Sequence, residues 1–96
     1  MRMEEADIVV VGAGLAGLCA ARDLVTAGQQ VVLVEARDRV GGRTWSAPFE
    51  AAGCVVDLGA EWVDPHCHLA IMRELERYGI GLEAPEVVAK AELFSY

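Results

Sequence analysis

The feature that most constrains the fold is a glycine pattern placed between a short apolar run and an amphipathic segment. The pattern, GxGxxG, begins at Gly12 and ends at Gly17. The apolar run at residues 8–11 is continuous and β-branched, which is typical of a strand buried on both faces of a parallel sheet. Residues 15–27 carry apolar side chains at helical spacing, and Gly28 then supplies a stop. This order predicts a strand, a tight turn and a helix.

A second apolar run completes a βαβ unit. Residues 31–34 read Val-Val-Leu-Val, and Glu35 follows them directly. A strand, a helix and a strand within about 30 residues are joined by a crossover that is almost always right-handed. The chain has 96 residues, which is room for one small domain. The predicted fold class is therefore α/β, a Rossmann-like βαβ unit with an incomplete parallel sheet.

Each glycine of the pattern has its own role in binding a dinucleotide. Gly12 permits the tight turn, Gly14 lets a pyrophosphate approach the backbone, and Gly17 lets the helix pack closely on the sheet. The positive end of the helix, at Leu15 and Ala16, then favours the anion. The pattern predicts a dinucleotide site but serves NAD and FAD equally.

The acid at the end of the second strand narrows the choice of cofactor. Glu35 lies 23 positions after Gly12, where a carboxylate can accept hydrogen bonds from both ribose hydroxyls. Its charge would repel a 2′-phosphate, and only Arg37 nearby could suggest NADP. The alternative is a glycine-rich turn followed by a surface glutamate.

The segment after this acid favours the larger cofactor. Residues 39–44, RVGGRT, place paired glycines between arginines, which allows close backbone approach and supplies phosphate donors. A second diphosphate clamp suits a large, permanently held cofactor, and the alternative is a solvated basic loop. Because residues 36–49 are rich in Arg and Gly and contain Pro48, we predict an ordered loop over this range.

Two further elements are predicted. Residues 54–58 indicate another strand, which would extend the parallel sheet. A helix should begin at Asp64, as an N-cap, with Pro65 in its first turn, and run to Tyr78 before Gly79. Its buried positions would be Leu69, Ile71, Met72 and Leu75, and Glu74 and Arg77 would pair on its outer face.

Residues 7–44, DIVVVGAGLAGLCAARDLVTAGQQVVLVEARDRVGGRT, closely resemble the N-terminus of the flavin-containing amine oxidases. This family includes monoamine, polyamine, putrescine and L-amino-acid oxidases. The resemblance continues through residues 56–63, VDLGAEWV, which are similar to a family segment beside the flavin. The stretch EARDRVGGRT is the most specific part, and the resemblance covers most of the chain.

The resemblance implies an FAD-dependent oxidoreductase that acts on a small-molecule amine. Two electrons would pass from the carbon next to the amine to the flavin, and O2 would reoxidise the flavin and give hydrogen peroxide. Similar paired-glycine loops occur in protoporphyrinogen oxidases and carotenoid desaturases, so such a flavoprotein is the alternative. A third possibility is a non-catalytic fragment that binds nucleotide.

The resemblance also assigns a part of the cofactor to each matching residue. The glycines of the pattern would line the pyrophosphate and Glu35 would bind the adenosine ribose. Arg37 and Arg43 would hold the adenine or diphosphate side, and the Gly59–Trp62 segment would run close to the isoalloxazine ring. The full set of predicted cofactor-binding positions is Gly12, Gly14, Leu15, Ala16, Gly17, Glu35, Ala36, Arg37, Gly42, Arg43, Gly59, Ala60, Glu61 and Trp62. Glu61 could also bind a substrate ammonium or point to solvent, and Trp62 could simply pack.

Family members are several times longer than 96 residues. They carry a second FAD-contacting segment, a substrate domain, an active-site lysine and an aromatic cage. The only lysine here is Lys90, and nothing aligns it with the family's catalytic lysine. We therefore expect residues 1–96 to be the N-terminal part of an FAD/NAD(P)-binding Rossmann-like domain, with the substrate domain absent and the catalytic residues unknown.

Charge and residue counts argue against other functions. The net charge is −7, whereas nucleic-acid binding needs a positive surface. No apolar stretch approaches the roughly 18–20 residues of a membrane span. The three cysteines, Cys19, Cys54 and Cys67, form no CxxC motif and favour a reducing, cytoplasmic location. Cys19 and Cys54 are expected to be buried. No metal is expected at residues 66–68, His-Cys-His, because adjacent helical residues diverge by about 100°.

Overall fold

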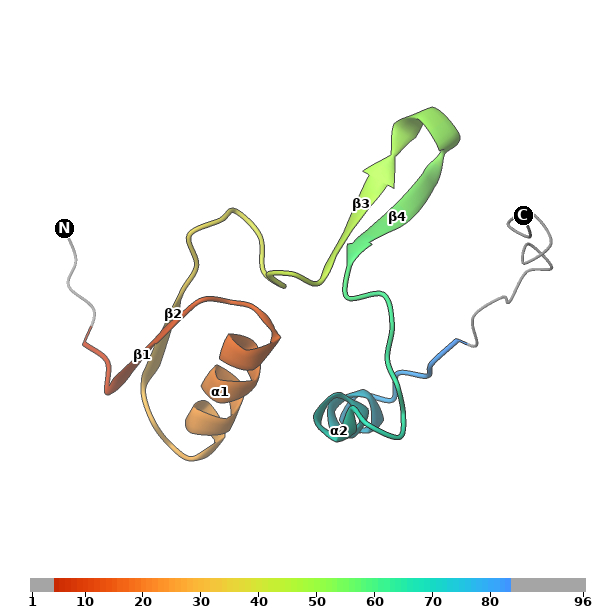
Figure 1. Ribbon diagram of the computed structural model, residues 1–96. Helices are drawn as coiled ribbons and strands as arrows, with labels where there is room; N and C mark the ends of the chain where they lie inside the picture. Colours follow the sequence, from red (N-terminus) through yellow and green to blue (C-terminus); the bar gives the residue numbers. More distant parts are fainter. Residues whose placement is uncertain (1–4, 84–96) are drawn as a thin grey trace. The chain divides into compact units, whose positions relative to one another are not determined.

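The computed structural model describes residues 5–83 (Figure 1). Its contacts divide the chain between Glu61 and Trp62, and each part is described by itself. The first part contains β1 (Ile8–Val11), α1 (Leu15–Thr26), β2 (Val31–Val34), β3 (Trp45–Phe49), a short 3₁₀ turn η1 (Glu50–Ala52) and β4 (Cys54–Gly59). The second part contains α2 (Leu69–Arg77). No helix within residues 5–83 is long and apolar enough to cross a membrane.

The predicted βαβ unit is confirmed. Strands β1 and β2 pair in parallel, from Ile8 opposite Val31 to Val11 opposite Val34. The helix α1 ends within one residue of the predicted position and is followed by Gly28 at φ +87°. It contacts both strands, so its apolar side lies against the small sheet. This unit brings the ends of β1 and β2 together, where the site lies.

The next two strands form an antiparallel hairpin, which corrects two expectations. The predicted loop over residues 36–49 is wrong from Trp45 onward, because β3 begins there. The strand β4 exists as predicted, but it pairs with β3, from Trp45 opposite Gly59 to Phe49 opposite Cys54, and does not extend the parallel sheet. Pro48 suggested a loop, yet within residues 5–83 the strand β3 pairs with β4 alone, and an edge strand tolerates a residue without an N–H.

The helix of the second part starts later than predicted. Asp64 initiates a turn, in which its carboxylate accepts the N–H of His66 at 2.8 Å and its carbonyl accepts the N–H of His68 at 2.9 Å. The N–H of Asp64 donates to Nδ1 of His68 at 3.0 Å. These bonds close a separate turn over residues 64–68, and α2 itself begins at Leu69, with His68 as its N-cap. Residues 66–68 are exposed, and no group of metal-ligating side chains gathers anywhere in residues 5–83.

Burial also differs from the prediction. Within residues 5–83 the only buried residue is Ala13, at 1% exposure. Leu69, expected to be buried, is 61% exposed, whereas Ile71, Met72 and Leu75 are half-buried. Glu74 and Arg77 form the expected ion pair at 4.0 Å. Cys54 is exposed and Cys19 is half-buried, so neither is the buried residue that was expected. The prediction for Lys90 lies outside the described residues.

Candidate cofactor-binding site

The turn between β1 and α1 has the geometry that the glycine pattern predicts. Gly12 has φ +99°, in the left-handed region that favours glycine. A Cβ on Gly17 would lie 1.8 Å from the carbonyl oxygen of Gly12, so only glycine allows the helix this close to the strand. A Cβ on Gly14 would meet no atom within 4 Å. The space over Gly14 is therefore open to a ligand.

The N-terminus of α1 has no capping side chain and no acidic residue of its own. Gly14 is the N-cap, no side chain caps the helix, and the first turn, with Leu15 and Ala16, contains no acidic residue. The N–H groups of a first helical turn and the helix dipole attract an anion. A diphosphate over Gly14 would meet open space and the positive end of a helix, so this turn fits the group that the sequence predicts.

Glu35 is held at this turn by two backbone hydrogen bonds. The N–H of Arg37 donates to Oε1 at 3.0 Å, and the N–H of Ala13 donates to Oε2 at 2.8 Å. These two bonds hold the pKa of the Glu35 carboxyl below its ordinary value, and the bond from Arg37 has the larger effect. The carboxyl group is therefore ionised at neutral pH. A carboxylate oxygen accepts two hydrogen bonds, so each oxygen keeps capacity for a ribose hydroxyl.

The paired glycines pack against the turn between β1 and α1, which is called the phosphate turn below. The N–H of Gly41 donates to the carbonyl of Ala13 at 2.7 Å. Gly41 and Gly42 have φ +105° and +60°, and a Cβ on Gly42 would lie 3.3 Å from Cα of Gly14. The loop and the turn, which are separated in the sequence by a helix and a strand, therefore meet backbone to backbone.

The base of the β3–β4 hairpin adjoins this loop. Gly59 pairs with Trp45, and a Cβ on Gly59 would lie 2.0 Å from the carbonyl oxygen of Arg43. Ala60 follows with φ +54°, a conformation that is uncommon for a residue other than glycine. The two segments of highest resemblance, EARDRVGGRT and VDLGAEWV, thus come into contact at Arg43 and Gly59.

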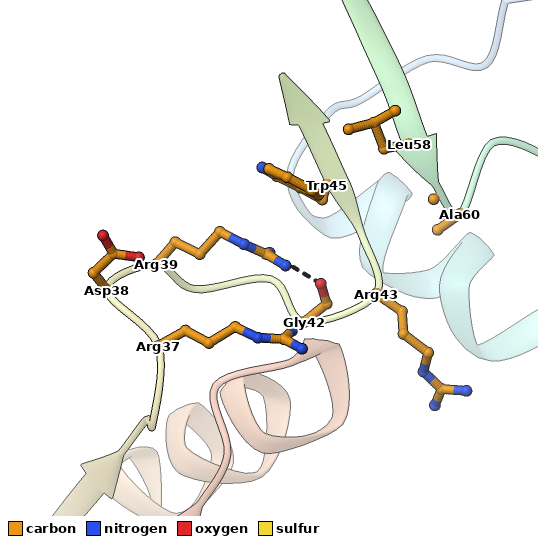
Figure 2. Close-up of a pocket in the computed structure, with 9 residues that line it drawn as sticks. Arg37, Asp38, Arg39, Gly42, Arg43, Trp45, Leu58 and Ala60 are labelled. Atoms are coloured by element: carbon orange, nitrogen blue, oxygen red, sulfur yellow. Dashed lines mark hydrogen bonds between the residues drawn. The ribbon is translucent and has the colours of Figure 1, made fainter. Parts of the chain in front are cut away.

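The loop and the hairpin base line an open hollow of about 790 Å³ (Figure 2). Its lining consists of Arg37, Asp38, Arg39, Gly42, Arg43, Trp45, Leu58, Gly59 and Ala60. Figure 2 shows the side chains of Arg37 and Arg39 extended toward Gly42, whereas Arg43 points away from both. Within residues 5–83, Arg37 and Arg43 form no ion pair, so two guanidinium groups are available for phosphate or adenine.

Some predicted positions are not part of this hollow. Glu61 and Trp62 do not line it, and Trp62 is 69% exposed at the start of the second part of the chain. Ala36 is exposed between Glu35 and Arg37. The predicted segment from residue 59 to residue 62 is therefore represented in the hollow only by its first two residues.

Ala13 and Trp45 were missed by the sequence analysis, and Arg39, which was expected to supply a phosphate donor, makes other contacts. Ala13, an unspecified position in GxGxxG, supplies the N–H that binds Glu35. Arg39 lies with its guanidinium carbon 4.6 Å from the centroid of the Trp45 ring, and its Nη1 donates to the carbonyl of Gly42 at 2.9 Å. No helical or strand period places residues 39 and 45 together, and the only signal was an aromatic residue shortly after a basic loop.

Comparison with known proteins supports the resemblance. The family described as flavin containing amine oxidoreductase matches residues 15–92. Putrescine oxidase of Kocuria rosea is 57% identical over 61 residues, covering 64% of this chain and 12% of that protein. The (S)-6-hydroxynicotine oxidase of Paenarthrobacter nicotinovorans is 43% identical over 75 residues, covering 77% and 18%. Amine oxidase [flavin-containing] B of Sus scrofa is 39% identical over 90 residues, covering 94% and 16%.

The fold is similar to solved structures of the same group. A putrescine oxidase bound to putrescine superposes with a TM-score of 0.70 at 44% identity, covering 77% of this chain and 16% of that one. Cyclohexylamine oxidase from Brevibacterium oxydans gives a TM-score of 0.59 at 38% identity, covering 74% and 16%. The chain therefore spans less than a fifth of the length of these relatives.

Proposed function

Because the chain belongs to the family of flavin-containing amine oxidoreductases, we propose that it forms the FAD-binding part of an amine oxidase. The family supports the oxidoreductase class and the flavin cofactor expected from the sequence, and it does not favour a protoporphyrinogen oxidase, a carotenoid desaturase or a non-catalytic module. The observation that carries the proposal is the meeting of the phosphate turn, the ionised Glu35 and the paired-glycine loop.

Each residue of this site is proposed to bind a different part of FAD. The open backbone at Gly14 and the N-terminus of α1 receive the diphosphate. Glu35 accepts the ribose hydroxyls, since its carboxylate is already oriented by two backbone N–H groups. Arg37 and Arg43 supply charge toward the diphosphate or adenine. The hairpin base, at Gly59 and Ala60, would hold the flavin end of FAD.

The chemistry assigned to the whole oxidase comes from the cofactor and the substrate class. Bound FAD supplies a two-electron acceptor for the carbon next to an amine, with O2 as the final acceptor and hydrogen peroxide as the product. This chain contributes binding and orientation. The three cysteines are free, which is typical of a reducing compartment and supports a cytoplasmic location.

Exposed apolar surface supports the proposal that the chain is one portion of a larger flavin domain. Val11 and Val9, both in the parallel strand β1, are 83% and 58% exposed. Strands of a parallel sheet in a complete doubly wound domain are covered on both faces. Further strands and helices of the same domain would cover these side chains.

The test is made on the full-length protein. We expect the purified protein to show the visible absorption of oxidised flavin, to release FAD on denaturation, and to produce hydrogen peroxide with at least one member of an amine panel. FMN in place of FAD, or tight stoichiometric binding of NADH without flavin, would contradict the proposed cofactor. Bound FAD with dehydrogenation of a substrate that is not an amine would contradict the proposed substrate class alone.

A further inference from the structure

The loop over residues 36–44 carries three arginines, and the structure gives one of them a different environment. Arg37 and Arg43 form no ion pair within residues 5–83. Arg39 is half-buried, and its guanidinium is engaged on two sides by the chain itself. The guanidinium of Arg39 is therefore bound by other groups of the same chain.

The two contacts of Arg39 connect the loop with the hairpin. Its Nη1 donates to the carbonyl of Gly42 at 2.9 Å, and the carbonyl of Val40 lies at 3.5 Å from the same nitrogen. Its guanidinium carbon lies 4.6 Å from the ring centroid of Trp45, the first residue of β3, within the range of a cation–π contact. Figure 2 shows the guanidinium between Gly42 and the Trp45 ring.

Gly42 in turn touches the phosphate turn. Its Cα faces Gly14 so closely that an added Cβ would lie 3.3 Å from Cα of Gly14. Gly42 therefore packs directly beside the glycine over which a diphosphate would lie. A group that fixes the carbonyl of Gly42 fixes this side of the turn without touching the ligand.

We propose that Arg39 is a positioning residue for the cofactor: its guanidinium, bound to the Gly42 carbonyl and stacked on Trp45, holds the paired-glycine loop against the turn over which the FAD diphosphate would lie. The inference rests on the proposed function, because it presumes that FAD is the ligand. A planar guanidinium can donate in its own plane to a carbonyl while its flat face covers a ring, whereas an ammonium has no flat face to stack and is more strongly hydrated. Arginine and lysine are therefore not equivalent at position 39.

The test uses the apoprotein of the full-length enzyme and measures its affinity for FAD by flavin fluorescence at several salt concentrations. The melting temperature of each apoprotein is measured as well. Arg39→Lys keeps the charge and should weaken FAD binding about tenfold, with the salt dependence and the melting temperature unchanged. Trp45→Leu should weaken binding similarly, and Trp45→Phe, which keeps an aromatic face, should bind as the wild type does. The double variant Arg39→Lys/Trp45→Leu should be no weaker than the weaker single variant. Arg73→Lys on α2 is the matched control and should change nothing.

Three results would overturn the inference. If Arg39→Lys binds FAD as the wild type does, only the charge matters. If Arg39→Lys changes the salt dependence as removal of an arginine does, Arg39 contacts phosphate directly. If the melting temperature of its apoprotein falls in step with affinity, the residue stabilises the whole fold. A wild-type protein that binds no FAD would overturn the proposed function itself, and with it the role of Arg39.

Discussion

The backbone N–H of Ala13, inside the phosphate turn, donates a hydrogen bond of 2.8 Å to Oε2 of Glu35, at the end of the second strand. This bond joins the glycine turn to the acidic residue that follows β2. It also means that Glu35 has two tasks, because the carboxylate that would bind ribose also holds the turn that would bind diphosphate. A substitution at Glu35 should therefore affect both parts of the site.

The first prediction concerns Glu35→Gln. The amide keeps one acceptor oxygen but places an NH2 group against the N–H of Ala13 or Arg37, so one of the two backbone bonds is lost. We expect FAD retention after extensive dialysis to fall by about tenfold or more. The measurement is the ratio of flavin to protein absorbance, with Glu50→Gln, an exposed residue of η1, as the control. Equal flavin content in both variants would rule out the role given to Glu35.

The second prediction is a pH dependence from the same carboxyl. Hydrogen bonds from the N–H groups of Arg37 and Ala13 lower the pKa of Glu35 below the value of 4.5 that applies to the unfolded chain. The stabilisation by the ionised form is complete above that value and is lost as the pH falls through the lowered pKa. The melting temperatures of the wild-type and Glu35→Gln apoproteins should therefore differ at neutral pH and converge in acid. A gap that widens on acidification would show the opposite sign of the shift.

The βαβ unit could be predicted because its signals are local: the glycine spacing, the helical period and the acid after β2 all lie within the same 28 residues as the structure they specify. The strand β3 was missed because Pro48 indicates a loop unless the strand is known to have one neighbour. The start of α2 was misplaced because the Asp-Pro signal at residues 64–65 opens a single turn that ends before the helix begins at Leu69. The contact of Arg39 with Trp45 depends on the course of the backbone between them, which the positive φ values of Gly41 and Gly42 determine. The spacing of residues in the sequence does not reveal that course.

The third prediction is that Arg37 and Arg43 make FAD binding depend on the salt concentration. Arg37 and Arg43 are exposed and lie at the hollow, so their attraction for phosphate is screened by added ions. Arg37→Gln and Arg43→Gln should each weaken FAD binding at low salt and reduce its dependence on ionic strength. The measurement is the dissociation constant of FAD from about 20 mM to about 500 mM NaCl. An unchanged salt dependence in both variants would show that neither guanidinium faces the cofactor.

The fourth prediction concerns residues 1–96 expressed alone. Within the described residues only Ala13 is buried, and strands β1 and β4 expose large apolar side chains. We expect this chain to aggregate, to bind FAD weakly and to produce no hydrogen peroxide with amines, because a reacting carbon must be held within about 3–3.5 Å of its acceptor. The measurement is peroxide release with FAD and an amine panel, beside free FAD as the control. Peroxide above that control would place a working amine site inside these residues.

The last prediction uses two glycines of one motif that differ in what surrounds them. A Cβ on Gly14 meets nothing within 4 Å, and Gly14 has the ordinary φ of −77°, so Gly14→Ala should leave the melting temperature of the apoprotein within about 2 °C of the wild type. The added methyl would occupy the space proposed for the diphosphate, and FAD affinity should fall by about tenfold or more.

A Cβ on Gly17 would lie 1.8 Å from the carbonyl oxygen of Gly12, so Gly17→Ala must move α1 away from β1. Overpacking of this kind costs about 1–3 kcal/mol, more than the gain of up to about 1 kcal/mol in helix propensity, and this variant should lose apoprotein stability as well as FAD. Gly81→Ala, where a Cβ also meets nothing within 4 Å, is the control and should change neither quantity. If Gly14→Ala binds FAD normally, the diphosphate does not lie over that glycine. If Gly14→Ala and Gly17→Ala lose stability equally, both glycines serve the fold alone.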